Sequence, residues 1–185
     1  MDYDQIMNPS KLLEYMKKNI MYGYLGNDNK IYYPSDKNFN IKWFNNYILE
    51  SPEEVINNMI GTCYDQVEFE REWFIKHDFE IKTFFIIAEV DYANDFPTHT
   101  YLAYKDNDNW LWFENADYDN RGIHLYNNLD DLIVDQYNKQ KLRYIEKNIW
   151  FSDIDNIHVY EYEKPKYNIS AKEFIDHCTS SKFVK

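Results

Sequence analysis

The chain is short of basic residues and of glycine, and each shortage excludes a class of protein. Its 185 residues hold 20 Lys and Arg against 32 Asp and Glu, which gives a formal net charge of −12. A surface this acidic repels phosphates, so we expect no nucleic-acid partner. Only 4 Gly occur, and none are grouped as in a phosphate-binding loop. Nucleotide-binding designs of that kind are therefore excluded.

Cysteine and long apolar runs are also scarce. Cys63 and Cys178 are too few for a disulfide framework, and with scattered histidines they lack the spacing of a zinc site. We therefore expect no metal and no cofactor. The longest apolar run covers residues 84–88, far fewer than the ~20 that cross a bilayer. No basic segment followed by an apolar run marks a signal peptide, so we expect a cytoplasmic protein without a membrane partner.

Aromatic residues are abundant. The chain contains 12 Phe, 18 Tyr and 5 Trp, and 44% of its residues are hydrophobic. Burial of this much apolar surface offsets the ordering entropy of folding. The length suits one domain, so we expect a single domain over residues 1–185 with an aromatic core. Nothing in the composition indicates an oligomeric state.

Local signals predict helices in the first part of the chain. Residues 10–19 carry apolar positions at helical spacing. A capping box at residues 51–54 starts a second helix that runs to about Met59, and Gly61 ends it. A longer helix is expected over residues 63–76. Four of its charged residues are expected to form a solvent-exposed face: Glu68, Glu70, Arg71 and Glu72. An internal pair between Glu68 and Arg71 is the alternative.

Signals for strands dominate after residue 77. Residues 82–91 are β-branched and aromatic enough for a central strand. The runs 98–105 and 110–115 flank the polar tetrapeptide 106–109, which predicts an antiparallel hairpin. A capped helix is expected from about residue 127, a strand over 157–163 and a last helix from Ser170. Helices followed by strands indicate an α+β fold.

Cys63 is the candidate nucleophile. Its predicted place in the first turn of a helix puts the thiol at the positive end of the helix dipole, which favours the thiolate. A small buried hydrophobe is the ordinary alternative for an intracellular cysteine. Cys178 lies in the last predicted helix without a nearby base, so we expect it to be structural.

A base and a carboxylate are expected to join this thiol. His99 opens one hairpin strand and Glu114 lies on the other. With an even-numbered turn, Tyr101 lies opposite Glu114, so His99 and Glu114 are diagonal neighbours about 7–8 Å apart on one face. An odd-numbered turn would instead make Asn115 or Asp117 the third residue.

The segment from about 51 to 126 resembles the transglutaminase-like superfamily, in particular a bacterial or phage member. Gly61-Thr-Cys-Tyr-Asp65 matches the family's Gly-x-Cys-x-Asp segment at a helix start. A histidine opening a strand and a Trp-x-x-x-Asp strand follow in the family, where this chain has His99 and Trp110-Leu-Trp-Phe-Glu114. The resemblance implies a papain-like fold, with N-terminal helices packed on an antiparallel sheet. Residues outside the segment are elaborations.

The resemblance implies a catalytic triad of Cys63, His99 and Glu114, with Glu where the family usually has Asp. The expected reaction is acyl transfer through a Cys63 thioester, which covers amide or peptide hydrolysis, deamidation and amine transfer. Its substrate would be a protein, a peptide or a small amide or amine.

Several residues are candidates to support this site. The Cys63 N–H is one expected donor to an oxyanion. Family members often use an upstream Trp or Gln as the second, which indicates Trp43 or Tyr47, although packing in an aromatic core is the ordinary role of both. Asp65 and Gln66 lie one turn from the thiol, and Asp65 is more often a partner of the helix dipole.

Further residues near the hairpin have two interpretations. Trp110 and Trp112 share the face of Glu114 and are expected to wall a cleft. His124 either lines the same cleft or is a structural histidine.

Two other functions are compatible with the sequence. A catalytically inactive acidic module of the same fold would bind a basic protein partner, as the net charge of −12 suggests. Arylamine N-acetyltransferases use the same triad logic but are usually longer than this chain.

Overall fold

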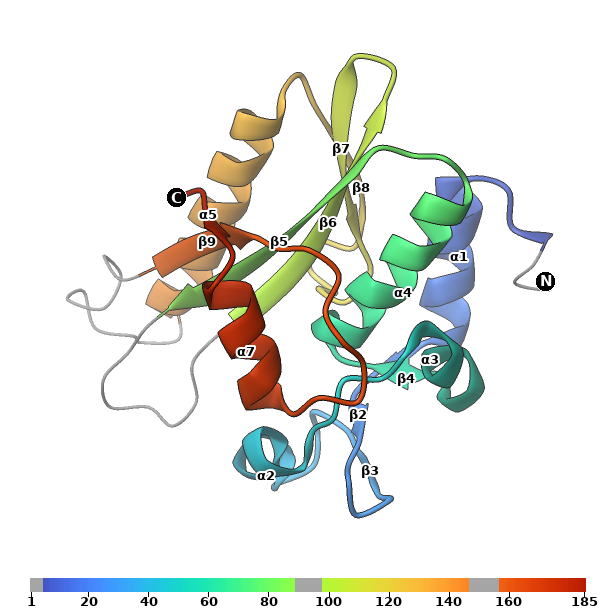
Figure 1. Ribbon diagram of the computed structural model, residues 1–185, viewed down its shortest axis with the longest axis vertical. Helices are drawn as coiled ribbons and strands as arrows, with labels where there is room; N and C mark the ends of the chain where they lie inside the picture. The colour runs from blue at the N-terminus through green and yellow to red at the C-terminus, as the bar shows by residue number, and fades with distance from the viewer. Residues whose placement is uncertain (1–4, 89–97, 147–156) are drawn as a thin grey trace.

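A six-stranded antiparallel sheet is the centre of the part of the chain that the computed structural model describes, residues 5–88, 98–146 and 157–185 (Figure 1). Its strands follow the order β10-β9-β5-β6-β7-β8. The expected strand over 82–91 is observed as β5, and residues 89–91 lie outside the described residues. The strands of this sheet are β5 (Ile81–Ala88), β6 (Thr98–Asp106), β7 (Asn109–Glu114), β8 (Gly122–Tyr126), β9 (Ile157–Glu161) and β10 (Lys182–Phe183).

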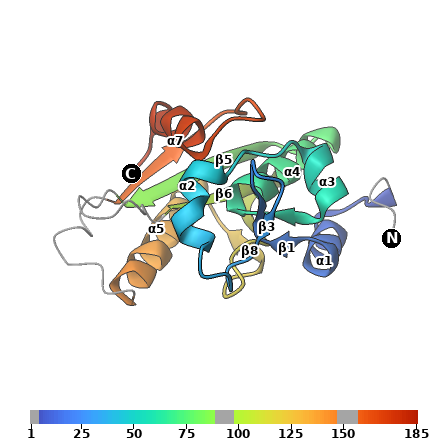
Figure 2. The same cartoon turned by 90° about the horizontal axis from the view of Figure 1, so that it is seen from below.

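Helices cover both faces of this sheet, which confirms the α+β expectation at that level (Figure 2). On one face α4 and α7 pack aromatic side chains on the strands, as when Phe74 lies 5.3 Å from Phe113 between ring centroids. On the other face α5 packs Leu132 and Ile133 against Phe84 and Trp112. The helices are α1 (Pro9–Asn19), α2 (Phe39–Asn46), α3 (Pro52–Asn58), α4 (Cys63–Lys76), α5 (Leu129–Glu146) and α7 (Ala171–Thr179).

Short strands join the N-terminal segment to the start of α4. Strand β1 (Met21–Tyr22) pairs in parallel with β4 (Ile60–Gly61), while β2 (Tyr24–Leu25) and β3 (Ile31–Tyr32) form a small hairpin. Gly23 lies where the chain approaches β3 closely, since a Cβ there would meet the Tyr32 carbonyl oxygen at 2.6 Å. The β1–β4 pair therefore sets a fixed backbone beside the residues that precede Cys63.

The β6–β7 hairpin has the predicted register. Asp106 pairs with Asn109 across a two-residue turn, and Leu102 pairs with Phe113. Asn107 takes a positive φ of 54°, as such turns require. The turn is even-numbered, so the alternative register that would have moved the carboxylate position does not occur.

The local helix signals were largely right. The capping box at Ser51 starts α3, and α4 spans Cys63–Lys76 as expected. Helix α2 and strand β8 were not predicted, because they carry no capping box and no strict alternation. Both lie against elements distant in sequence or along a sheet edge, so tertiary contacts support them more than local propensity does.

The expected solvent-exposed face of α4 was wrong for three of its four residues. Glu68, Glu70 and Arg71 are buried, whereas Glu72 is exposed. Arg71 Nε donates to Glu68 Oε2 at 2.9 Å, which is the internal pair given as the alternative. The reason is that α4 is buried around most of its circumference, between the sheet and the N-terminal helices, so its charges need partners inside the fold.

A search of the described helices found none with the length and apolar character needed to cross a bilayer.

Candidate functional site

Cys63 is the first residue of α4, and a polar cap holds this helix end in place. Thr62 donates from its backbone N and its Oγ1 to Asp65 Oδ2, each at 2.8 Å. The cap fixes the direction in which α4 begins and therefore where the thiol projects. The side chain of Cys63 is buried, at the positive end of the helix dipole.

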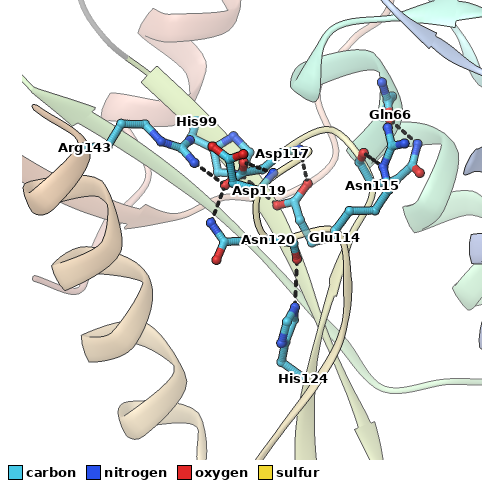
Figure 3. A network of polar contacts seen from close by, with 10 residues as sticks. Gln66, His99, Glu114, Asn115, Asp117, Asp119, Asn120, His124 and Arg143 are labelled. Carbon is cyan, nitrogen blue, oxygen red and sulfur yellow. Dashed lines mark hydrogen bonds and ion pairs between the residues drawn. The ribbon is translucent and has the colours of Figure 1, made fainter. Parts of the chain in front are cut away.

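His99 and Glu114 form the central contact of the site (Figure 3). His99 Nε2 lies 2.8 Å from Glu114 Oε2, and both side chains are buried. Glu114 Oε1 accepts from the backbone N–H of Asp117 at 2.8 Å, which fixes the carboxylate. The structure thus places on His99 the carboxylate that the sequence analysis favoured.

His99 carries a positive charge at neutral pH. Burial by itself would lower the pKa of His99, but the Glu114 carboxylate and the side chain of Cys63, which shares a hydrogen bond with His99, raise that pKa to about 10. Nε2 faces Glu114, so Nδ1 is the nitrogen left for Cys63. The three residues therefore form the line Cys63, His99, Glu114.

Asn115 does not contact the imidazole but joins the hairpin to α4. Its Nδ2 donates to Gln66 Oε1 at 2.7 Å, and Gln66 Nε2 donates to the Gly61 carbonyl oxygen at 2.8 Å. Arg121 Nε donates to the Asn115 carbonyl oxygen at 2.7 Å. We call Asn115, Gln66 and Gly61 the amide bridge, because it links the strand end that carries Glu114 to the backbone just before Cys63.

Both carboxylate oxygens of Asp65 accept structural hydrogen bonds. Besides the cap to Thr62, its Oδ1 accepts from Tyr47 Oη at 2.6 Å and from Glu50 N at 2.9 Å. Burial raises the pKa of Asp65 to about 6, although these hydrogen bonds act in the opposite direction. The residue anchors the start of α4, in agreement with its expected ordinary role.

Trp43 and Tyr47 both lie in the aromatic core. The Trp43 ring packs 5.6 Å from the rings of Tyr47 and Tyr64, and the Tyr47 hydroxyl is committed to Asp65. These contacts match the packing role that the sequence analysis gave as the ordinary one. Neither residue is therefore placed as a second oxyanion donor.

Tyr22 is a neighbour of Cys63 that sequence reasoning missed. Its Cα pairs with that of Gly61 in the β1–β4 pair. Its phenol hydrogen-bonds to the side chain and to the backbone of Cys63, and burial followed by the Cys63 charge raises the pKa of Tyr22 well above the ordinary value. No sequence signal marks it, because a two-residue parallel pair has no recognisable pattern.

Glu70 is a second missed residue, two turns along α4 from Cys63. It is buried, and its Oε2 has no hydrogen-bond partner. Burial and then the charge of Glu114 raise the pKa of Glu70 well above its usual range. The charged form of Glu70 is therefore disfavoured by its burial and by the nearby Glu114.

A cavity of about 630 Å³ opens beside His99, with Tyr22 also in its lining. Arg143 of α5 forms part of its wall and donates to Asp117 Oδ2 at 2.6 Å. Burial opposes ionisation of Asp117, but hydrogen bonds from Asn120 and Arg143 hold its pKa below the usual value. The cavity therefore reaches His99, whereas Cys63 is not among the described residues that line it.

The expected tryptophan wall was wrong. Trp112 is buried on the α5 side of the sheet and stacks on His124, with 4.6 Å between ring centroids. His124 Nε2 contacts the Asn120 carbonyl oxygen at 2.8 Å. Trp110, Trp112 and His124 are not among the described residues that line the cavity, although the pleat places Trp110 and Trp112 on the same face of β7 as Glu114.

Within the described ranges, no group of three or more His, Cys, Asp or Glu is arranged to hold a metal ion.

Cys178 is buried in α7, and burial raises its pKa well above the usual thiol value. The two cysteines thus have different surroundings.

Comparison of the chain with protein-family models, with curated proteins and with solved structures found no significant match.

Proposed function

We propose that this protein is a thiol-dependent acyl-transfer enzyme of transglutaminase-like, papain-like arrangement, with Cys63 as nucleophile. The observation that carries the proposal is the position of His99, whose Nε2 lies 2.8 Å from Glu114 Oε2 while the imidazole also hydrogen-bonds to Cys63. A nucleophile, a base and an orienting carboxylate in this order are the requirement for covalent catalysis by a thiol.

The first half-reaction forms a thioester. The Cys63 thiolate attacks the carbonyl carbon of an amide, and the C=O electron pair moves to the oxygen, which the Cys63 N–H stabilises. His99, as imidazolium, then gives the proton on Nδ1 to the amide nitrogen. The C–N bond breaks, the amine leaves, and the acyl group remains on Sγ.

The second half-reaction returns the free enzyme. Neutral His99 takes a proton from water or from a primary amine as that group attacks the thioester carbonyl. The C–S bond breaks, the Cys63 thiolate leaves, and the imidazolium is restored. Glu114 keeps its charge in both halves and stabilises the imidazolium whenever it forms.

The buried surroundings favour this chemistry electrostatically. His99, Glu114 and Cys63 are shielded from bulk water, and charge interactions are stronger in such a site than in solvent. The raised pKa of His99, about 10, keeps the imidazole protonated at neutral pH. A thiolate–imidazolium pair requires this protonated imidazole.

The proposal is tested by trapping the acyl enzyme. The protein is mixed with p-nitrophenyl acetate, and peptide mass mapping locates the acetyl group. We expect acetylation of Cys63 in the wild type and in Cys178→Ala, loss of it in Cys63→Ala, and a rate about 100-fold lower in His99→Ala, because the imidazolium that stabilises the thiolate is removed. Solvent water, or a primary amine added to the mixture, should release the acetyl group over time.

Iodoacetamide gives an independent measure of the same thiol. Cys63 should be alkylated faster than Cys178 near neutral pH, because Cys178 is buried with a raised pKa and no base beside it. Equal, slow reaction of both thiols with both reagents would contradict the proposed enzyme. It would point to the acidic binding module, which should keep its partner in Cys63→Ala.

A further inference from the structure

Tyr22 is placed at Cys63 by backbone pairing. Gly23 N donates to the Gly61 carbonyl oxygen at 3.4 Å, and Met21 N donates to the Met59 carbonyl oxygen at 3.0 Å. These bonds enclose Tyr22, so its Cα stays opposite Gly61, two residues before Cys63. Tyr22 lines the same cavity as His99.

The phenol of Tyr22 meets both atoms that matter for acyl transfer. Its oxygen accepts from the backbone N–H of Cys63, and its O–H donates to the Cys63 side chain. The backbone N–H of the nucleophile is the group that would hold the developing oxyanion. The phenol therefore lies where negative charge builds up during the reaction.

We propose that the Tyr22 hydroxyl is the second oxyanion donor of the Cys63 site, an inference that rests on the proposed acyl-transfer function. When Sγ bonds to the substrate carbon, the negative charge leaves sulfur and moves to the carbonyl oxygen. That oxygen replaces the phenol oxygen as the acceptor of the Cys63 N–H. The phenol O–H, which has lost its charged acceptor on sulfur, donates to the oxyanion instead.

The phenol stays in the required protonation state throughout. Burial first, and then the Cys63 charge, hold the pKa of Tyr22 well above its ordinary value, so the phenol is a neutral donor near neutral pH. No proton changes place in this step. A hydrogen bond to an ionised acceptor is about twice as strong as one between neutral groups, so the donor favours the tetrahedral state.

Two of the other candidates for this role, Tyr47 and Gln66, have committed donors, and the third packs its ring in the aromatic core. Tyr47 Oη donates to Asp65 at 2.6 Å, and Gln66 Nε2 donates to the Gly61 carbonyl oxygen at 2.8 Å. Trp43 contacts the rings of Tyr47 and Tyr64. Tyr22 is the residue whose polar group is directed at Cys63 itself.

The test compares two reactions of the same thiol in Tyr22→Phe. Acylation by p-nitrophenyl acetate passes through an oxyanion, whereas alkylation by iodoacetamide is a direct displacement with none. The p-nitrophenolate leaving group needs no proton, so the acylation rate does not depend on His99 as an acid. We expect acylation to fall about 10²- to 10³-fold and alkylation to change by no more than a few fold.

Tyr24→Phe is the matched control. Tyr24 lies two residues further on, and its hydroxyl donates to the Phe39 carbonyl oxygen at 3.2 Å, away from Cys63. Both rates should stay near the wild-type values. Because Tyr22 is half-buried and keeps its ring in the phenylalanine variant, we expect a folded protein, checked by circular dichroism and by selectivity for Cys63 over Cys178.

Two results would overturn the donor role, and a third would overturn the proposed enzyme. An equal loss in both rates would mean that Tyr22 acts on the thiolate rather than on the oxyanion. A rise in acylation would mean that Tyr22 covers the site. A wild-type protein that is alkylated at Cys63 but never acylated would overturn the proposed enzyme itself, which is a distinct observation.

Discussion

At the residue scale, His99 depends on two neighbours for its charge. Glu114 and the side chain of Cys63 raise its pKa to about 10 against the effect of burial. A group whose pKa is raised in the folded state is charged up to that pKa. The imidazolium is therefore present below pH ~10 and is lost as the pH rises through that value.

Glu114→Gln should shift this titration. It keeps the shape of the side chain and removes the charge, so the pKa of His99 should fall toward its ordinary value. The rate of acylation by an amide substrate should drop about 10²-fold at pH 8, and its alkaline fall should move to lower pH. The measurement is a pH–rate profile from pH 6 to pH 11.

Glu114→Asp is the control for that change. It retains the charge and should keep the alkaline fall near the wild-type position, with a smaller loss of rate from the shorter reach. An unchanged profile in Glu114→Gln would mean that the carboxylate does not hold the imidazolium, and the triad as proposed would be wrong.

At the element scale, the amide bridge joins α4 to the end of β7. Gln66 supplies both of its side-chain hydrogen bonds, at 2.7 Å to Asn115 and at 2.8 Å to Gly61. Asn115 is fully buried, and its Oδ1 already lacks a partner. Loss of Gln66 would leave Asn115 Nδ2 without its partner and remove one of the two hydrogen bonds that the Gly61 carbonyl oxygen accepts.

Gln66→Met should therefore destabilise the protein and slow the thiol chemistry together. The expected loss is about 1.5–4.5 kcal/mol, because an unsatisfied buried group costs about 1–3 kcal/mol and a lost hydrogen bond about 0.5–1.5 kcal/mol. Urea unfolding and the acylation rate of Cys63 measure the two effects.

Gln136→Met is the matched control for this change. Gln136 is buried in α5, and its Nε2 already has no partner, so its loss should cost less. Equal costs in the two variants would show that the bridge is not special to the site.

The α4 helix also shows where local reasoning fails. Its start, at a cap of Thr62 and Asp65, follows from adjacent residues. The burial of Glu68 and Arg71 does not follow from adjacent residues, because Thr83 of β5 and Tyr162, which follows β9, supply their remaining partners. A charged stretch looks solvent-exposed until the elements that cover it are known.

At the scale of the whole molecule, stability should fall as the pH rises from mildly acidic values. Burial raises the pKa of Glu50 to about 8 and that of Asp65 to about 6. A raised folded-state pKa contributes stability that is complete below the unfolded value and is lost as the pH passes the folded value. For Glu50 this window runs from about 4.5 to about 8, and for His99 from 6.5 to about 10.

Glu50→Gln tests this pH dependence. Between pH 5 and pH 8.5 the melting temperature of the variant should fall less than that of the wild type. The difference should be about 2–4 °C for each kcal/mol of unfolding free energy that the variant does not lose. Thermal unfolding at both pH values gives the comparison. Glu53, exposed on α3, provides the control, since Glu53→Gln should leave the slope unchanged. A Glu50→Gln curve parallel to the wild type would contradict the assignment.

The sequence by itself determined the elements that depend on neighbouring residues. The cap at Ser51, the start of α4 at Cys63 and the even-numbered turn between β6 and β7 follow from adjacent side chains and backbone preferences. The hairpin register then set the parity of His99 and Glu114, so their proximity was predictable.

Only the tertiary structure decided which groups meet Cys63. Tyr22 reaches it through a two-residue parallel pair, and Glu70 interacts with Glu114 and His99 because α4 is enclosed. The physical reason is that hydrogen bonds and burial between distant segments carry no periodicity in the chain. The commitment of Tyr47 to Asp65, and of Asn115 to Gln66, was likewise set by packing rather than by spacing.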